Sequence, residues 1–592
     1  MAAVFGLGVL GWTIAAPVTA QETKTEAKPA KKAVVKAEAK APAKKAGKAE
    51  AKPAEKADDA TAKKEEKPAA PIKLPATVYS TGYKGSYEEL IGFVNTQIRE
   101  GWVANEVMPS DVAEDGEWLR RVHLDIVGHI PDFETTEKFL EDKAKDKRFQ
   151  MIESLLEDPG YVRNFTTIWA NLLIGRIPQR DISRPAMEKF LRESFAKNRA
   201  WSDIVTDLLT AEGHHIENGA ANYLLSHLND GQVPATAISA KLFLGRQVQC
   251  TQCHNHPFNE WKQDAFWEFN SFFKQAEKVE YRKYDDRTGR MVFDYMELIV
   301  KQDVEEGVFF ETRNALMKVA YPRYHGIDVD REPTTNRRKE LAKLILQGEH
   351  TEVAEAMVNR MWAQFFGYGF VKPTDDMGPH NAPSHPAALE RLTKEFVKSG
   401  YDMKQLVRWI CNTEAYNLTS KFNDRNQKDN PPAGEPQLFS HLYVKSMNVE
   451  QLYDSLLVAT NADKAGTGSD DKVNANRQQW LRRFVVAFGT DENDESTNFD
   501  GTIPQALMMM NGELVQKALK GEAGSRLHKV INSKGSPNLK IRQLYLVSLC
   551  RQPSRAEISK AEAVLRGAKT PMEAYQDLYW ALLNSNEFIF NF

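Results

Sequence analysis

The sequence is poor in cysteine, with 4 in 592 residues. This number excludes a small disulfide-stapled scaffold, because such scaffolds carry many cysteines in a short secreted chain. Two of the four, Cys411 and Cys550, stand in apolar runs. We therefore expect them to be buried free thiols that pack as small hydrophobic groups.

A strong net charge is also missing, since the formal net charge is only -3. The stretch 22–73 holds 15 Lys and 9 acidic residues, so it is basic and the rest of the chain is acidic. An acidic globular part lacks the basic face that phosphate contacts need. We therefore predict no nucleic-acid partner.

Several signatures of membrane proteins and enzymes are absent. No apolar run after residue 20 has the length of a membrane span, so we predict no transmembrane span in the mature chain. The sequence contains no Gly-x-Ser-x-Gly elbow, no phosphate loop and no dinucleotide fingerprint. Motifs alone therefore do not establish an enzyme.

The beginning of the chain has the pattern of an exported protein. Residues 1–20 are apolar and end in Val18-Thr-Ala20, a small-residue cleavage pattern, although no Lys or Arg precedes the apolar run. Residues 21–76 are rich in Lys, Ala and Pro, and they cannot bury enough apolar area to fold. We predict a cleaved signal peptide, a disordered tether able to contact the cell surface, and a periplasmic or cell-surface location.

The remaining sequence predicts a mainly α fold. Apolar residues recur at helical spacing over 86–278 and again over 336–592, which indicates two helical domains. Between them, residues 279–335 alternate apolar and polar side chains, and 286–289 (Asp-Arg-Thr-Gly) is a plausible hairpin turn. We expect a small β-containing connector between the two helical domains.

Individual helix boundaries can also be predicted. Thr135 or Thr136 is placed to cap the helix that carries Phe139, and Ser384 and Asp402 are placed to cap two later helices. We expect Gly367 to end the helix that precedes it.

The strongest chemical signal is the segment 248–258, which we call the Cys/His segment. It contains Cys250-x-x-Cys253-His254, the spacing of c-type haem attachment. The two thiols can add to the two haem vinyl groups, and the imidazole of His254 can bind the iron. Candidates for a second axial ligand are His214, His215, Met291 and His380.

Two other readings of the Cys/His segment stay open. The first is a zinc site, with Cys250, Cys253 and His256 as ligands and His254 and His256 as the imidazoles available to a metal. The second is a disulfide or redox pair between the two cysteines, which an oxidising compartment permits.

A weaker signal lies in one later loop. Asp375, Asp376, His380 and His385 could bind a metal or act as acid and base if their side chains converged. The competing interpretation is that they order the loop and begin the next helix, and we favour it.

Several motifs together resemble one secreted family. These motifs are Trp118-Leu-Arg-Arg-Val-His-Leu-Asp125, Phe243-Leu-Gly-Arg-Gln-Val-Gln-Cys250, Cys253-His-Asn-His-Pro-Phe258, Ala356-Met-Val-Asn-Arg-Met-Trp362, Phe366-Gly-Tyr-Gly369, Pro383-Ser-His-Pro386, Tyr401-Asp-Met-Lys-Gln-Leu406 and Leu582-Leu-Asn-Ser-Asn-Glu-Phe588. The chain is similar to the planctomycete cytochrome-like proteins that pair the domains of unknown function numbered fifteen-forty-nine and fifteen-fifty-three.

The resemblance implies export and a cytochrome-like character, but it supplies no substrate. Together with the Cys/His segment it predicts an exported protein that binds haem c for electron transfer and meets a redox or cell-envelope protein partner. The alternative is a cell-surface or periplasmic structural or interaction protein with zinc or a disulfide at the same segment.

Overall fold

The computed structural model describes residue 74 and residues 87–179, 181–302, 307–346, 351–465, 479–487 and 503–592. The predicted signal peptide lies outside the described residues, as does the predicted tether apart from Leu74. None of the described helices is both long and apolar enough to cross a bilayer.

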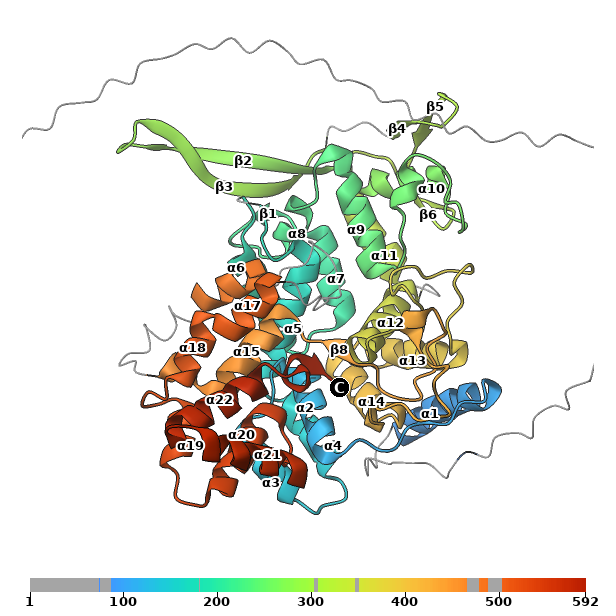
Figure 1. Ribbon diagram of the computed structural model, residues 1–592. Helices are drawn as coiled ribbons and strands as arrows, with labels where there is room; N and C mark the ends of the chain where they lie inside the picture. The colour runs from blue at the N-terminus through green and yellow to red at the C-terminus, as the bar shows by residue number, and fades with distance from the viewer. Residues whose placement is uncertain are drawn as a thin grey trace, which may run out of the picture. The chain divides into compact units, whose positions relative to one another are not determined.

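Helices make up most of the described chain, which confirms the predicted mainly α fold (Figure 1). The helices that precede the main strands are α1 (Glu88–Ala104), α2 (Asp115–Val127), α3 (Phe133–Glu141), α4 (Lys147–Leu156), α5 (Pro159–Ile174), α6 (Arg184–Ala196), α7 (Trp201–Thr210), α8 (Ala221–Leu225), α9 (Val233–Phe243) and α10 (Gln263–Asn270). The later helices are α11 (Arg337–Leu346), α12 (Glu352–Phe366), α13 (Pro386–Lys398), α14 (Met403–Cys411), α15 (Val449–Thr460), α17 (Ile503–Asn511), α18 (Glu513–Leu519), α19 (Arg526–Asn532), α20 (Pro537–Leu549), α21 (Arg555–Gly567), α22 (Pro571–Leu583) and α23 (Asn586–Ile589).

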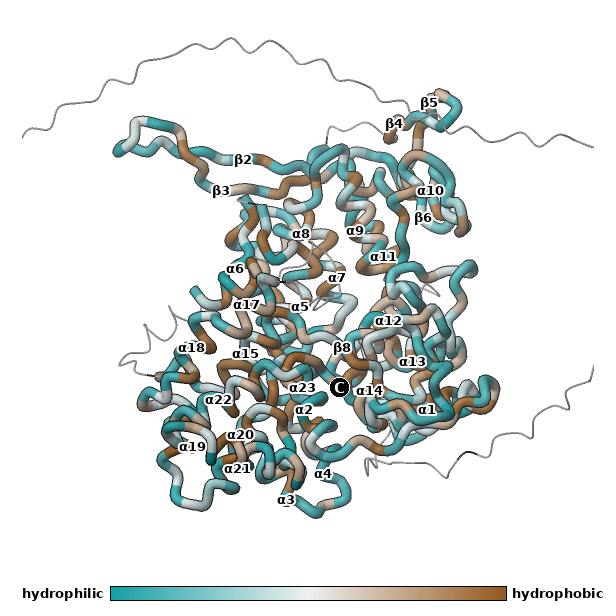
Figure 2. Tube along the Cα trace, in the orientation of Figure 1, coloured by the Kyte–Doolittle hydropathy of each residue, from teal (hydrophilic) through white to brown (hydrophobic). Residues whose placement is uncertain are grey.

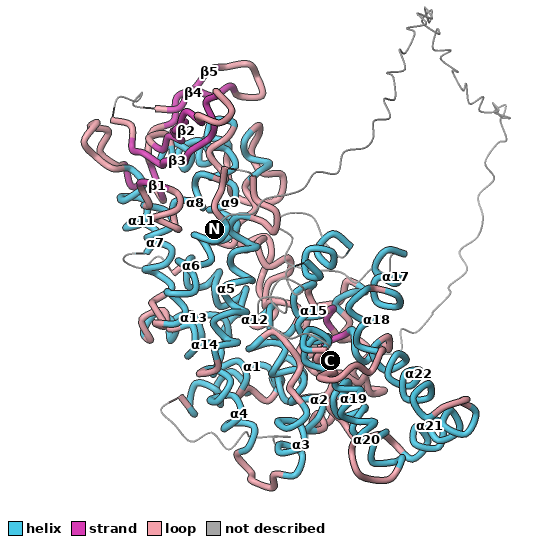
Figure 3. The backbone as a smooth tube through the Cα atoms, turned by 90° about the vertical axis from the view of Figure 1, so that its left-hand side faces the viewer, coloured by secondary structure: helices cyan, strands magenta, loops and turns pink. Residues whose placement is uncertain are grey.

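The strands form small antiparallel sheets. They are β1 (Gly213–His214), β2 (Ala276–Asp285), β3 (Arg290–Val300), β4 (Val308–Glu311), β5 (Met317–Ala320), β6 (Arg323–Tyr324), β7 (Ile327–Asp328), β8 (Lys445–Ser446) and β9 (Phe590–Asn591). The largest sheet has the order β1-β3-β2, and β1 to β5 lie together, drawn in magenta in Figure 3. The long β2–β3 hairpin turns at 286–289, as predicted, and Gly289 has the positive φ (+65°) that such a turn needs.

The buried side chains form two hydrophobic cores. The first takes residues from α1 through to Tyr443, and the second takes most of its residues from Met447 onward. Apolar and polar stretches alternate along the helices, as amphipathic helices require (Figure 2). The division of the chain into domains at 278 and 336 stays a prediction.

Helix α2 contributes to both cores. Trp118 and Leu119 pack into the first core, whereas Leu124 packs into the second. Every residue of α2 from Trp118 to Val127 is buried, so the helix has no solvent face. It begins with Asp115 and Glu117 in its first turn, where negative charge suits the helix dipole, and Gly128 ends it in the left-handed conformation.

The structure corrects two of the predicted caps and confirms the others. Helix α3 is capped by Asp132, which accepts from the Thr135 amide at 2.8 Å, so neither Thr135 nor Thr136 is the cap. His385, not Ser384, directly precedes α13. The Ser384 hydroxyl lies 3.0 Å from the His385 ring nitrogen, and no side chain accepts from an amide of the first turn of α13.

Asp402 caps α14 by accepting from the Gln405 amide, and Gly367 ends α12 in the left-handed conformation. Both outcomes confirm the prediction, because a single local residue decides each helix end.

Candidate functional site

The Cys/His segment follows α9 and is anchored at its start by two buried residues. Val248, which is 1% exposed, lies just before a single turn of 3-10 helix, Gln249–Gln252. Thr251 lies within that turn and is fully buried. The Thr251 hydroxyl donates to the Val248 carbonyl at 2.6 Å, and the Thr251 amide donates to the same oxygen at 2.9 Å. These bonds fix the backbone at the position of the first cysteine.

The second half of the segment is tied to α10. The Gln252 carbonyl accepts from the Gln263 side-chain amide and from the Trp267 indole, both at 3.1 Å. The Asn255 side chain accepts from the Gln263 amide at 3.0 Å, and the His256 amide donates to the Trp261 carbonyl at 2.8 Å. The loop is therefore held by its backbone, which leaves its thiols and imidazoles on the surface.

The three residues of the haem-attachment pattern are all exposed. Cys250 and Cys253 are free thiols on the surface, so the disulfide considered as an alternative is not formed. The Nδ1 atom of His254 lies 2.7 Å from the Asn255 carbonyl oxygen, which can only accept, so Nδ1 is the donor. The lone pair of the His254 ring then lies on Nε2, the nitrogen through which an imidazole can bind a metal.

His256 has the opposite arrangement. Its Nδ1 atom accepts from the amides of Phe258 at 3.3 Å and Asn259 at 3.0 Å, so its proton lies on Nε2. Desolvation by neighbouring groups is the main cause that lowers the pKa of His256. Binding a metal through His256 would therefore break two hydrogen bonds that shape the loop, whereas His254 requires no such change.

The described residues contain no group of three or more Cys, His, Asp or Glu side chains gathered as a metal site. The predicted zinc ligands Cys250, Cys253 and His256 are thus not brought together as a coordination shell.

Of the four candidates for a second axial ligand, His380 is the one whose ring contacts the Cys/His segment. Its ring centroid lies 6.2 Å from that of His256. His214 and His215 lie in and next to β1, where His214 stacks on Tyr295 of β3. Met291 lies on the β2–β3 hairpin close to its turn and is exposed.

The four acid/base candidates do not converge. Asp376 accepts from His380 Nε2 at 3.0 Å, but Asp375 accepts from Gln247 at 2.7 Å. His385 is 5% exposed and packs against Phe439, with ring centroids 5.5 Å apart. Of these four residues, only Asp376 and His380 are hydrogen-bonded to each other. The geometry therefore fits the favoured interpretation, that the residues order the loop, better than a shared role in acid/base catalysis.

Sequence reasoning missed a buried polar cluster on α2. Arg120, Arg121 and Asp125, which we call the α2 polar cluster, are 3%, 0% and 1% exposed. A buried charge is costly unless it is paired and hydrogen-bonded, so each of these groups needs several partners.

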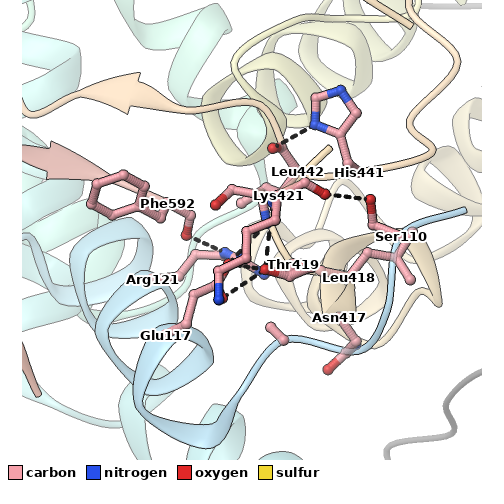
Figure 4. A network of polar contacts seen from close by, with 12 residues as sticks. Ser110, Glu117, Arg121, Asn417, Leu418, Thr419, Lys421, His441, Leu442 and Phe592 are labelled. Atoms are coloured by element: carbon pink, nitrogen blue, oxygen red, sulfur yellow. Dashed lines mark hydrogen bonds and ion pairs between the residues drawn. The ribbon is translucent and has the colours of Figure 1, made fainter. Parts of the chain in front are cut away.

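The partners of the two arginines are backbone carbonyls far away in the sequence. Arg120 donates to the carbonyls of Ser548 and Phe588. Arg121 donates to Phe592 at 2.6 Å (Figure 4). It also donates to Tyr416 and Leu418 at 2.8 and 3.0 Å.

Arg121 also donates to Glu117 at 3.0 Å, and Glu117 in turn accepts from the Thr419 hydroxyl at 2.8 Å. Figure 4 shows this connected network between α2 and the segment around Thr419. Helix α2 is thus hydrogen-bonded to chain segments that lie about three hundred or more residues away from it in the sequence.

Asp125 completes the cluster. It accepts from Lys445, Asn591 and the Tyr416 hydroxyl, each at 2.8 Å. Burial lowers the pKa of Lys445, while the charge of Asp125 opposes that shift. The sequence signal that could have revealed this cluster is the occurrence of Arg-Arg and Asp in a helix with apolar residues on all sides.

Comparison with known protein families matches two regions of the chain. Residues 93–278 match PSCyt2, a protein of unknown function (DUF1549), and residues 337–565 match PSD1, a protein of unknown function (DUF1553). The chain belongs to the family in which these two domains are paired. This confirms the predicted resemblance. No curated protein and no solved structure matches the chain.

The two matched regions show in which family domain the Cys/His segment and the α2 polar cluster lie. The DUF1549 region contains both the Cys/His segment and α2, and the DUF1553 region contains the carbonyls of Tyr416 and Leu418 that Arg121 binds. The α2 polar cluster is therefore a connection between the two paired domains.

Proposed function

We propose that the Cys/His segment binds haem c covalently and that the protein transfers electrons outside the cytoplasm. The observation that carries the proposal is the orientation of His254, whose Nδ1 donates to the Asn255 carbonyl and whose Nε2 keeps its lone pair. Haem ligation uses an imidazole in this state, with its other nitrogen hydrogen-bonded to a carbonyl or carboxylate.

The chemistry of the other donors supports the same proposal. Cys250 and Cys253 are exposed and free, so each sulfur is accessible to a haem vinyl group without unfolding of the chain. The haem would supply one-electron redox chemistry, and the chain would hold it through two thioether bonds and one imidazole. Phe258, whose ring is 80% exposed beside these donors, offers an apolar surface that a macrocycle could cover.

Export is part of this proposal, because haem c is attached outside the cytoplasm. The apolar residues 1–20 and their small-residue end support export to the periplasm or cell surface. The partner would be a redox or cell-envelope protein, and the basic tether would be free to contact the cell surface.

A second candidate is a structural or interaction protein that holds zinc at the same place. The observation in its favour is the second pair of metal-binding side chains, His380 and Asp376, next to His256. Zinc requires three or four ligands gathered in one shell, and His256 would have to release two backbone amides to join it. We therefore rank zinc below haem.

The test is the intact mass and the pyridine haemochrome spectrum of protein purified from its native host. We expect a covalent mass increase by one haem and a c-type absorption band, both lost in the Cys250→Ser/Cys253→Ser variant. An unmodified mass with no c-type band overturns the proposal.

Two neighbouring histidines provide a matched pair of variants. His254→Gln should alter the haem spectrum because the axial imidazole is lost, whereas His256→Gln should leave the spectrum unchanged. If His256→Gln instead removes about one zinc per chain, as measured by metal analysis, the zinc candidate replaces haem.

A further inference from the structure

Asn255, which has no part in the haem-attachment pattern itself, connects the His254 ring to helix α10. Nδ1 of His254 donates to the Asn255 carbonyl at 2.7 Å, and the backbone amide of Gln263 donates to the Asn255 side-chain oxygen at 3.0 Å. Gln263 is the first residue of α10, and Lys262 before it makes no side-chain cap. The Asn255 side chain therefore satisfies one of the amides that a helix leaves without an internal partner.

Helix α10 is a firm support for this contact. The Gln263 side chain is 6% exposed, and it donates to the carbonyls of Gln252 at 3.1 Å and Glu311 at 2.9 Å. The Trp267 indole donates to the same Gln252 carbonyl at 3.1 Å, and its ring stacks on Phe310, with centroids 5.7 Å apart. The helix is thus fixed both to the turn between the two cysteines and to strand β4.

The His254 ring, in contrast, has little support of its own. His254 and Asn255 are both exposed, and the bond to the Asn255 carbonyl is the one hydrogen bond shown for the ring within the described part of the chain. Such a bond fixes the ring only if the carbonyl itself is fixed.

Two bonds fix the peptide group that contains this carbonyl. One is the bond from the Gln263 amide to the Asn255 side chain. The other runs from the N–H of the same peptide group, which belongs to His256, to the Trp261 carbonyl at 2.8 Å. Both partners lie at the beginning of α10 or just before it, so this end of the helix determines where the carbonyl points.

We propose that Asn255 is a positioning residue for His254, because its side chain fixes against α10 the carbonyl that orients the imidazole. The inference rests on the proposed haem function, in which Nε2 of His254 binds the iron. A ligand that is oriented in advance loses less rotational freedom on binding. A hydrogen bond from Nδ1 to a carbonyl also makes the imidazole a stronger donor to a metal.

The first test uses the full chain produced without haem attachment. Nitrogen NMR of isotope-labelled histidine shows which ring nitrogen carries the proton. We expect the His254 proton on Nδ1 in the unsubstituted chain. Asn255→Ala should lower the ratio of the Nδ1–H form to the Nε2–H form by at least about threefold, because the ring loses its fixed acceptor. An unchanged ratio overturns the proposal.

Two further measurements in the same spectra separate positioning from a general loosening of the loop. Asn255→Asp keeps a side-chain acceptor for the helix amide and should keep the ratio of the unsubstituted chain. His129, whose Nδ1 lies 2.8 Å from the Ile130 carbonyl, makes the same kind of contact elsewhere and is the reference for an intact fold. A lowered ratio in Asn255→Asp as well as in Asn255→Ala overturns the proposal.

A matched pair at Gln263 tests the same bond from the helix side. Gln263→Ala removes the side chain and keeps the amide, whereas Gln263→Pro removes the amide too. Proline is tolerated at the first position of a helix, and Lys262 already has the extended backbone (φ -101°, ψ 158°) that a residue before proline needs. The ratio should be lower in Gln263→Pro than in Gln263→Ala, and equal ratios contradict the role of Asn255.

The second test uses chain that carries haem. Asn255→Ala should raise the reduction potential, because a weaker hydrogen bond at Nδ1 makes the His254 imidazole a poorer donor to ferric iron. A c-type band with an unchanged potential overturns the positioning role and leaves the proposed function standing. The absence of a c-type band in the unsubstituted chain overturns the proposed function, and the NMR ratio then still decides whether Asn255 orients His254.

Discussion

The α2 polar cluster and the Cys/His segment belong to the same family domain, yet their surroundings are opposite. Arg121 is fully buried and makes four hydrogen bonds to the chain itself. Cys250 and Cys253 are exposed free thiols, and His254 keeps one ring nitrogen without a hydrogen-bond partner among the described residues. A polar side chain whose hydrogen bonds are all made within the protein therefore has a structural role, whereas one with an exposed, unused donor or acceptor is a candidate for binding a ligand.

The largest effect is expected from Arg121→Ala. The substitution leaves the buried carbonyls of Tyr416 and Leu418 and the partly buried Phe592 oxygen without the guanidinium, and Glu117 loses its paired charge, which should cost about 3–5 kcal/mol of the free energy of unfolding. Urea denaturation measures this loss. The control is Arg566→Ala, whose side chain is 70% exposed in an i,i+4 pair and should cost less than about 1 kcal/mol. Similar losses of unfolding free energy in the two variants would show that the buried hydrogen bonds of Arg121 stabilise the fold no more than an exposed ion pair does.

The next effect tests whether the charges of the α2 polar cluster act as a unit. Asp125→Asn leaves Lys445 buried without a counter-charge and should cost about 3 kcal/mol in urea denaturation. The Asp125→Asn/Lys445→Met double variant should lose less than the sum of the single variants, by at least about 1 kcal/mol. Strict additivity would mean that the two side chains contribute independently.

Buried and exposed histidines should differ in their effect on stability at acidic pH. Burial lowers the pKa of His385 from 6.5 to about 4, so the unfolded chain takes up the proton first as the pH falls. The contribution of His385 is complete above pH 6.5 and decreases below it, by about 2 kcal/mol at pH 5.

The measurement is urea denaturation between pH 7 and pH 5. His385→Leu should lose less stability over this range than the unsubstituted chain. An unchanged slope in His385→Leu would show that this ring is not held neutral by burial.

The smallest effect on stability is expected at the Cys/His segment. Cys250→Ser/Cys253→Ser should change the free energy of unfolding by less than about 0.5 kcal/mol in chain produced without haem attachment, because both side chains are exposed. Two thiols should react with a thiol reagent in that folded chain and all four after unfolding, since burial raises the pKa of Cys411 and Cys550. Four reactive thiols in the folded chain would contradict the burial of the second pair.

Features set by a few neighbouring residues were predictable. The hairpin turn at 286–289, the Asp402 cap and the end of α12 at Gly367 each depend on one local residue type. The predicted burial of Cys411 and Cys550 also holds, because Cys411 ends the apolar run of α14 and Cys550 directly follows that of α20. The predicted cap at Thr135 or Thr136 was wrong, because α3 begins earlier, at Phe133, and Asp132 caps it by accepting from the Thr135 amide.

The sequence by itself determined the mainly α fold, the family and the presence of two thiols and an imidazole at haem-attachment spacing, because periodicity and spacing are local properties of the chain. Only the tertiary structure decided which nitrogen of His254 keeps its lone pair, and that Asp375 and His385 contact Gln247 and Phe439. It also decided that Arg121 and Asp125 bind segments about three hundred or more residues away. These outcomes depend on which distant carbonyls and side chains pack around each group, and a linear pattern does not specify such partners.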